Sequence, residues 1–99
     1  MISFNERCYE KLQKVPKGKI TTYKDLAHAV KTRAYRAVGT AMNNNPYAPQ
    51  VPCHRVINAS GFVGGFAHGT NKKIRMLKKE GIEIKNGKVV NMQRYLYRF

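Results

Sequence analysis

The stretch from residue 22 to residue 44 restricts the fold most, because it predicts two short helices joined by a tight turn. Thr22 and Asp25 form a capping signal for a first helix of roughly residues 22 to 30. A second helix is expected over roughly residues 33 to 44. Both segments carry apolar side chains at the three- and four-residue spacing of a buried helix face. Two such helices joined by a turn form a helix-turn-helix.

The outward face of the second predicted helix is basic and has little bulk. It carries Arg33, Arg36, Thr40 and Asn43, with Gly39 beside them. Such a face can lie close against a nucleic-acid groove. An ordinary helical hairpin with solvated arginines explains the pattern equally well, so the two helices alone do not decide between these interpretations.

The overall charge favours the DNA-binding interpretation. Nineteen Lys and Arg residues against five Asp and Glu residues give a net charge of +14 in 99 residues. An excess of this size repels itself and is typical of a protein that binds a polyanion. The basic residues are spread along the chain and are not gathered on one amphipathic helix, which favours nucleic acid over a membrane surface.

The flanking segments predict one mainly helical α+β domain over residues 1–99. A capping box at Ser3 and Glu6 opens a helix that ends at Pro16. Asn86-Gly87 between alternating apolar positions predicts a C-terminal β-hairpin. The expected fold is therefore a winged-helix-like, helix-turn-helix DNA-binding domain with a small hairpin.

A further helix is expected between the two glycine-containing turns of the C-terminal half. Thr70 is predicted to cap it, and it runs through Glu80 with Ile74 and Leu77 facing inward. Its basic residues are all predicted to lie on the exterior: Lys72, Lys73, Arg75, Lys78 and Lys79.

The segment from Val51 to Val56 places Cys53 beside His54. A thiolate is a strong nucleophile, and a neighbouring imidazole can accept its proton. Cys8, in contrast, lies on the apolar stripe of the first helix and is expected to be a buried hydrophobic residue. Neither a disulfide framework nor structural zinc is expected from two cysteines without a Cys-x-x-Cys spacing.

Together these features suggest a nucleophilic cysteine on a DNA-binding domain. A cysteine protease would need a substrate cleft and a third orienting residue, and it would have no use for so much positive charge. A reactive thiol near DNA suits alkyl transfer, in which sulfur attacks an alkyl carbon and the base leaves. The base must then be flipped out of the duplex to reach the sulfur.

The chain resembles the O6-alkylguanine-DNA alkyltransferase family. Residues 52–56 match the Pro-Cys-His-Arg-Val signature of that family. The resemblance covers most of the chain in the right order, through Val15-Pro16-Lys17-Gly18-Lys19, Thr22-Tyr23, Arg36-Ala37-Val38-Gly39, Asn45-Pro46, Ser60-Gly61 and Glu80-Gly81.

The resemblance implies a catalytic relay and no cofactor or metal. Cys53 would accept the alkyl group irreversibly, so that each molecule acts once. His54 would deprotonate Cys53 through a bridging water, and Glu80 would hold the imidazole.

The resemblance also implies roles on the DNA side of the site. Arg36 would enter the duplex from the minor groove and replace the flipped nucleotide, although a phosphate contact or solvation explains it too. Tyr23 would rotate the nucleotide by crowding its 3′ phosphate, and core packing is the alternative. Asn45 would brace the turn between the recognition helix and the active-site segment, or simply end the helix.

Support residues and a pocket complete what the resemblance implies. Pro52 and Arg55 would hold the active-site loop in place. The segment from residue 64 to residue 69 would line the alkylguanine pocket with backbone groups, and Val63 and Phe66 would add an apolar wall. Phe66-Ala67 stands where members often have Tyr-Ser, which removes hydroxyls that could bond the leaving guanine.

Two other interpretations stay open. The family usually carries an amino-terminal domain, and this chain is expected to be the catalytic and DNA-binding domain without it. Short forms resemble the alkyltransferase-like proteins, which recognise damage without repairing it. Those proteins have another residue in place of the nucleophilic cysteine. The presence of Cys53 therefore favours transfer. The third interpretation is a basic regulator in which Cys53 is structural.

The expected partner is double-stranded DNA that contains O6-alkylguanine, bound by a monomer through the minor groove. The start of the chain lacks the regions of a signal peptide, and its apolar stretches are too short to span a membrane. A cytoplasmic location with the nucleoid is therefore expected, or a nuclear one in a eukaryote.

Overall fold

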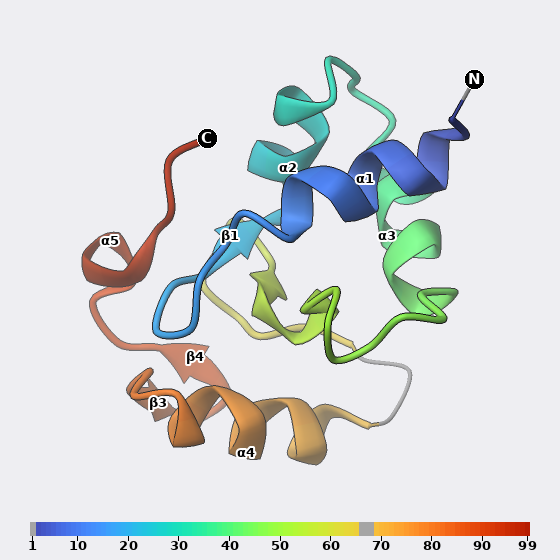
Figure 1. Cartoon of the computed structure of the whole chain (residues 1–99). Helices are drawn as coiled ribbons and strands as arrows, with labels where there is room; N and C mark the ends of the chain where they lie inside the picture. Colours follow the sequence, from blue (N-terminus) through green and yellow to red (C-terminus); the bar gives the residue numbers. More distant parts are fainter. Residues whose placement is uncertain (1, 66–68) are drawn as a thin grey trace.

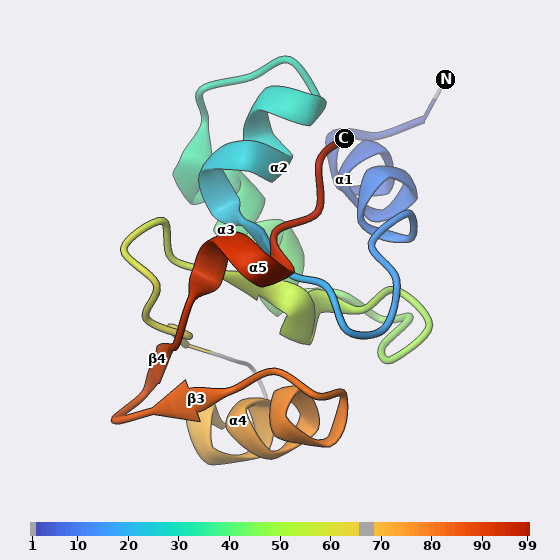
Figure 2. The same ribbon diagram turned by 90° about the vertical axis from the view of Figure 1, so that its left-hand side faces the viewer.

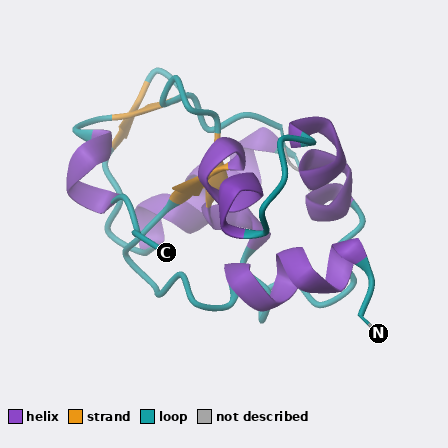
Figure 3. Ribbon diagram, turned by 90° about the horizontal axis from the view of Figure 1, so that it is seen from above, coloured by secondary structure: helices purple, strands orange, loops and turns teal. Residues whose placement is uncertain are grey.

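The computed structural model describes residues 2–65 and 69–99 (Figure 1). In chain order the elements are α1 (Phe4–Leu12), β1 (Thr21–Thr22), α2 (Tyr23–Ala29), α3 (Tyr35–Asn43), the 3₁₀ turn η1 (Cys53–Arg55), β2 (Val56–Ile57), α4 (Thr70–Lys79), β3 (Ile84–Lys85), β4 (Lys88–Val89) and α5 (Met92–Tyr95). Helices dominate, and the strands form two short pairs (Figure 3). The predicted α+β fold class is confirmed. No helix among the described residues has the length and apolarity needed to cross a membrane.

Hydroxyl caps set the starts of α1 and α2. The Ser3 hydroxyl accepts a hydrogen bond of 3.1 Å from the Glu6 amide, and the Thr22 hydroxyl accepts one of 3.0 Å from the Asp25 amide. Each bond satisfies an amide that the first helical turn leaves without a backbone partner.

Helices α2 and α3 form the predicted helix-turn-helix, but the second helix begins later than residue 33. It starts at Tyr35, because the Thr32 hydroxyl accepts a 3.1 Å hydrogen bond from the Ala34 amide and holds the preceding residues in a turn. Arg33 therefore lies in the turn and not on the helix.

Two apolar clusters make up the core. The first joins α1, α2 and α3 to the segment around Cys53, and it includes Cys8, which is fully buried as predicted. The second joins β2 to α4 and the hairpin through residues such as Ile57, Leu77 and Ile82. Figure 2 shows the two groups of elements stacked, with α4 and the hairpin at one end and α2 at the other.

A two-residue parallel strand pair connects the two halves. β1 pairs with β2, with Thr21 opposite Val56 and Thr22 opposite Ile57. Because β1 runs directly into α2 and η1 runs directly into β2, the pair places the start of the helix-turn-helix beside the Cys53 segment. The C-terminal tail packs back on the domain, since the Ile20 amide donates to the Tyr95 carbonyl over 2.9 Å.

The C-terminal hairpin is confirmed. β3 and β4 are antiparallel, and the turn residues Asn86 and Gly87 have φ angles of 54° and 75°. Asn and Gly tolerate this left-handed backbone better than other residues, which is why the pair specifies the turn.

Helix α4 corrects two predictions. Thr70 is its first residue and provides no side-chain cap, because Gly69 occupies the N-cap position with a φ of 97°. Lys73 is fully buried and does not lie on the exterior. Lys73 precedes Leu77 by four residues, so both side chains project from the inner face of the helix.

Candidate active site

Cys53 begins the 3₁₀ turn η1 and is almost completely buried against the first core cluster. The Cys53 amide donates to the Val51 carbonyl over 2.9 Å, and the Arg55 amide donates to the Pro52 carbonyl over 2.9 Å. These bonds hold the residues around the sulfur in one tight turn. Pro52 fits the turn because it precedes η1 at a position that needs no donated hydrogen bond.

Asn45 braces the approach to this turn from the end of α3. Its Nδ2 donates to the Val51 carbonyl over 2.7 Å, and its Oδ1 accepts from the Tyr47 amide over 2.9 Å. The side chain thus connects the segment after α3 to the residue two positions before Cys53.

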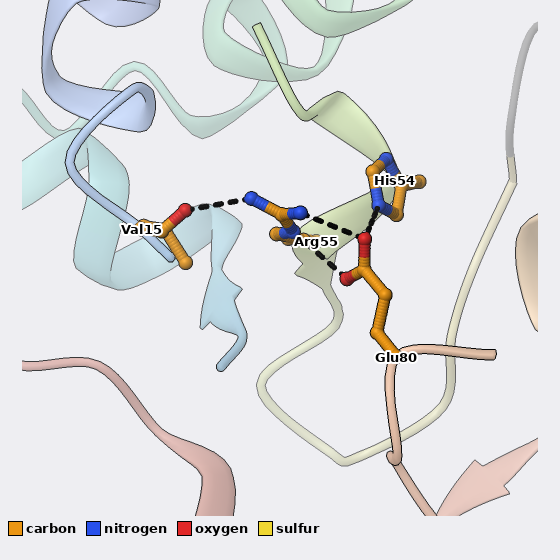
Figure 4. A network of polar contacts seen from close by, with 4 residues as sticks. All are labelled: Val15, His54, Arg55 and Glu80. Carbon is orange, nitrogen blue, oxygen red and sulfur yellow. Dashed lines mark hydrogen bonds and ion pairs between the residues drawn. The ribbon is translucent and has the colours of Figure 1, made fainter. Parts of the chain in front are cut away.

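His54 and Glu80, 26 residues apart in the chain, lie in direct contact. The Nε2 of His54 is 3.0 Å from the Oε2 of Glu80 (Figure 4). A carboxylate accepts a hydrogen bond, so in the neutral ring Nε2 carries the proton and Nδ1 is left as an acceptor. Within the described residues the Cys53 sulfur makes no hydrogen bond to His54.

Arg55 holds Glu80 from the other side. Its Nε donates to Oε1 over 2.8 Å and its Nη2 donates to Oε2 over 2.7 Å, while Nη1 donates to the Val15 carbonyl over 2.9 Å (Figure 4). A bidentate pair of this kind holds the Glu80 carboxylate in position and favours its ionised form. Arg55 therefore ties the segment after α1, the turn η1 and the end of α4 into one network.

The network sets the charge states of His54 and Glu80. Burial lowers the pKa of His54 below its usual value, the charges of Arg55 and Lys73 lower it further, and the hydrogen bond to Glu80 opposes them. Burial alone would raise the pKa of Glu80, but its hydrogen bonds to Arg55 and His54 hold that pKa below the usual value. At neutral pH the pair is therefore a neutral imidazole and a carboxylate.

Lys73 is a polar residue of the site that the sequence prediction missed. Its ammonium donates to the Val56 carbonyl over 2.6 Å and to the Gly65 carbonyl over 3.2 Å, and it lies 5.7 Å from the centre of the Tyr23 ring. Burial lowers its pKa from 10.5 to about 8, and the nearby Cys53 sulfur favours the charged form. The spacing of Lys73 to Leu77 was the signal that could have placed it inside.

The residues predicted to contact DNA lie on or beside the outer face of α3. Arg33 and Arg36 are exposed, and the Thr40 hydroxyl donates to the Arg36 carbonyl over 3.1 Å. Apart from its chain neighbours and its own helix backbone, no described atom lies within 4 Å of the place where a Cβ of Gly39 would stand, so the face stays low there. Tyr23, at the start of α2, is half-buried against the first core cluster, and burial raises its pKa.

The predicted pocket is only partly described. Val63 is buried in the second core cluster, and its amide donates to the Gly87 carbonyl over 3.0 Å. Core packing therefore accounts for Val63 whether or not it also lines a pocket. Phe66 and Ala67 lie outside the described residues. No group of three or more His, Cys, Asp or Glu side chains that could hold a metal ion lies in residues 2–65 and 69–99.

Comparison with known protein families gives one match over most of the chain. Residues 3–82 match the family described as the 6-O-methylguanine DNA methyltransferase, DNA binding domain. A methylated-DNA–protein-cysteine methyltransferase of Metallosphaera sedula is 45% identical over 83 residues, which are 84% of this chain and 52% of that protein. A bifunctional methyltransferase/endonuclease of Picrophilus torridus is 40% identical over 90 residues, which are 90% of this chain and 30% of that protein. The chain thus spans about half the length, or less, of these curated relatives.

Two solved structures have similar folds. S. pombe Atl1, in complex with damaged DNA containing O6-carboxymethylguanine, aligns over 100% of both chains with a TM-score of 0.86 and 29% identity. Mycobacterium tuberculosis OGT in complex with DNA aligns over 82% of this chain and 50% of its own, with a TM-score of 0.78 and 39% identity.

Proposed function

Because the chain belongs to the family of 6-O-methylguanine DNA methyltransferase DNA-binding domains, we propose that it binds duplex DNA carrying O6-alkylguanine and transfers the alkyl group irreversibly to Cys53. The observation that carries the proposal is the His54–Glu80 hydrogen bond of 3.0 Å, next to a buried cysteine. A base with its tautomer fixed by a carboxylate is what activates a thiol nucleophile.

The proposed reaction is a single displacement. A water bridges the Cys53 thiol to the free Nδ1 of His54 and passes the proton to the imidazole, with Glu80 stabilising the imidazolium. The S–C bond forms as the C–O6 bond breaks, and the electron pair stays on the base, which takes up a proton and leaves as guanine. The depressed pKa of His54, caused first by burial, keeps the ring neutral and able to accept the proton at neutral pH.

The placement of α2 and α3 supports the proposed DNA-side roles. Arg33, Arg36, Gly39 and Thr40 offer an exposed, partly basic surface that fits the minor groove. Arg36 fills the space of the flipped nucleotide, and Tyr23 crowds its phosphate while its ring also packs on the core. Lys73, held between the Val56 and Gly65 carbonyls, keeps the start of the pocket loop beside the active-site strand.

A second function is favoured by one specific observation. The chain aligns with all of S. pombe Atl1, whose structure holds O6-carboxymethylguanine DNA. A protein that binds alkylated DNA and recruits other repair factors without efficient transfer is therefore the alternative. The presence of Cys53 with an assembled relay supports transfer.

An intact-mass measurement tests the proposal. We expect incubation with duplex DNA containing O6-methylguanine to add the mass of one methyl group to the chain, and the same duplex with unmodified guanine to add none. Tight, lesion-selective binding without a mass change would support the damage-recognition alternative. Equal affinity for both duplexes without transfer would leave a general DNA-binding protein.

Arg36→Ala is expected to slow transfer from duplex DNA more than transfer from free O6-benzylguanine. The reason is that only the duplex requires a side chain to replace the flipped base. Arg98→Ala, which removes an exposed charge from the C-terminal tail, is the matched control and should leave the ratio of the two rates unchanged. If Arg36→Ala slowed both reactions equally, its role in flipping would be disproved.

A further inference from the structure

The outer face of α4 carries a row of four exposed basic residues that the proposed function does not use. We call it the α4 basic row: Lys72, Arg75, Lys78 and Lys79. The residues follow one another at the spacing of a single helix face, whereas Lys73 and Leu77 on the opposite side are buried. The row is therefore one continuous surface.

Helix stability does not account for the row. Lys78 and Lys79 in the last turn interact well with the helix dipole, but Lys72 stands in the first turn, where the dipole disfavours a positive charge. Arg75 lies three residues from both Lys72 and Lys78, which places like charges side by side. Among the described residues the row makes no ion pair, and the adjacent Glu80 is held by Arg55 and His54.

The side chains of the row indicate which class of partner it binds. A protein-binding surface would place apolar or aromatic side chains at its centre and would contain few lysines. A membrane-binding face would need an exposed apolar stripe beside the charges. On α4, Leu77 belongs to the second core cluster, Ile74 packs against it, and Met76 is half-buried, so no exposed apolar stripe lies beside the cations of the row. Such a surface fits a phosphate backbone.

The location of the row separates it from the proposed minor-groove surface. Figures 1 and 2 both place α4 at the end of the molecule opposite α2. The second core cluster lies against the inner face of α4, so the row faces away from the helix-turn-helix. We propose that the α4 basic row binds the phosphates of a second DNA duplex while α3 holds the first. The inference rests on the proposed binding of DNA by α3.

The test compares two variants with the same change in charge. The row variant replaces Lys72, Arg75, Lys78 and Lys79 with Gln, which keeps helix propensity. The control variant replaces basic residues elsewhere: Lys11, Lys14, Lys17 and Arg98. Bridging is measured as energy transfer between donor-labelled and acceptor-labelled undamaged short duplexes, and affinity for one duplex is measured separately by anisotropy.

We expect the wild-type chain and the control variant to bridge the duplexes, and the row variant to lose bridging while it keeps the single-duplex affinity of the control. In the wild-type chain, the four phosphate contacts of the row should contribute about 3 to 4 to the log–log slope of bridging against salt concentration.

Four results would overturn the inference. The first is the absence of bridging by the wild-type chain, and the second is an equal loss of bridging in both variants. The third is a loss of single-duplex affinity in the row variant alone. The fourth is a row variant that still bridges duplexes but no longer binds phosphatidylserine vesicles as the wild-type chain does. Failure of the wild-type chain to bind even one duplex would overturn the proposed function and the bridging with it. Loss of bridging alone would leave the proposed function standing.

Discussion

Replacing Cys53 with alanine is expected to abolish methyl transfer completely while leaving lesion binding in place. The variant has no atom that can accept the alkyl carbon, but the helix-turn-helix and the relay around it are unchanged. Removing one buried sulfur should cost about 1 kcal/mol of folding stability, which leaves the chain folded. Intact mass after incubation with O6-methylguanine duplex, together with a binding titration on the same duplex, checks both halves of the expectation.

Cys8 provides the matched control for this experiment. It is the other cysteine of the chain and is also buried, on the inner face of α1. Burial raises the pKa of the Cys8 thiol, only partly offset by the charge of Arg7, so Cys8 is held as an unreactive thiol. Cys8→Ala should therefore gain one methyl group as the wild-type chain does. Persistent transfer in Cys53→Ala would show that another side chain is the acceptor.

Replacing Glu80 with glutamine is expected to slow transfer by about 100-fold, in line with the loss of a general-base system. The amide keeps the shape of the carboxylate, but it cannot stabilise the imidazolium of His54, and it leaves the buried guanidinium of Arg55 without a counter-charge. The same change should lower the free energy of unfolding by about 3 kcal/mol, because it breaks a largely buried ion pair. Single-turnover rates and urea unfolding measure the two effects.

The effect of Glu80→Gln on stability should depend on pH. The pKa of Glu80 is depressed below 4.5 in the folded chain, so the carboxylate stabilises the fold above that pH and loses this effect as the pH falls. The difference in stability between wild type and Glu80→Gln should therefore shrink below pH 4.5. In the wild-type chain, His54 also lowers the stability of the fold as the pH falls. Its folded pKa lies below 6.5, so acid protonates the imidazole of the unfolded chain first.

Glu83→Gln is the control for Glu80→Gln. Glu83 is exposed, lies three residues further along the chain, and makes no ion pair among the described residues. Its replacement should leave the transfer rate unchanged and alter stability by less than about 0.5 kcal/mol. A rate loss in Glu83→Gln as large as that in Glu80→Gln would mean that net charge, and not the relay, explains the effect.

Local signals account for the parts of the fold that the sequence predicted well. Ser3 and Thr22 cap their helices through hydroxyls three residues from the amides they bind, and Asn86-Gly87 turns the hairpin with its own backbone preference. These interactions join residues only a few positions apart in the chain, so the local sequence predicts them. The helix-turn-helix was predicted for the same reason.

Interactions between distant residues were predicted only through the family resemblance, or were missed. The contacts of Arg55 with Glu80 and with the Val15 carbonyl span 25 and 40 residues, and nothing in local spacing indicates them. The strand pair between β1 and β2 has two residues on each side, too few for an alternating pattern. Local spacing also gives no sign that Lys73 is satisfied inside, since lysine is rarely buried and the two carbonyls that accept its hydrogen bonds come from other segments.

Helix α4 sets the spacing between two side chains that contact the Cys53 segment. Lys73 and Glu80 are seven residues apart, which is about two turns and about 10 Å along the axis, so both groups project toward the Cys53 segment from the same side. Lys73 donates to the Val56 and Gly65 carbonyls, and Glu80 orients the imidazole of His54. A single inserted or deleted residue between them would rotate one group by about 100° relative to the other. The site therefore depends on the number of residues between Lys73 and Glu80 as well as on their identity.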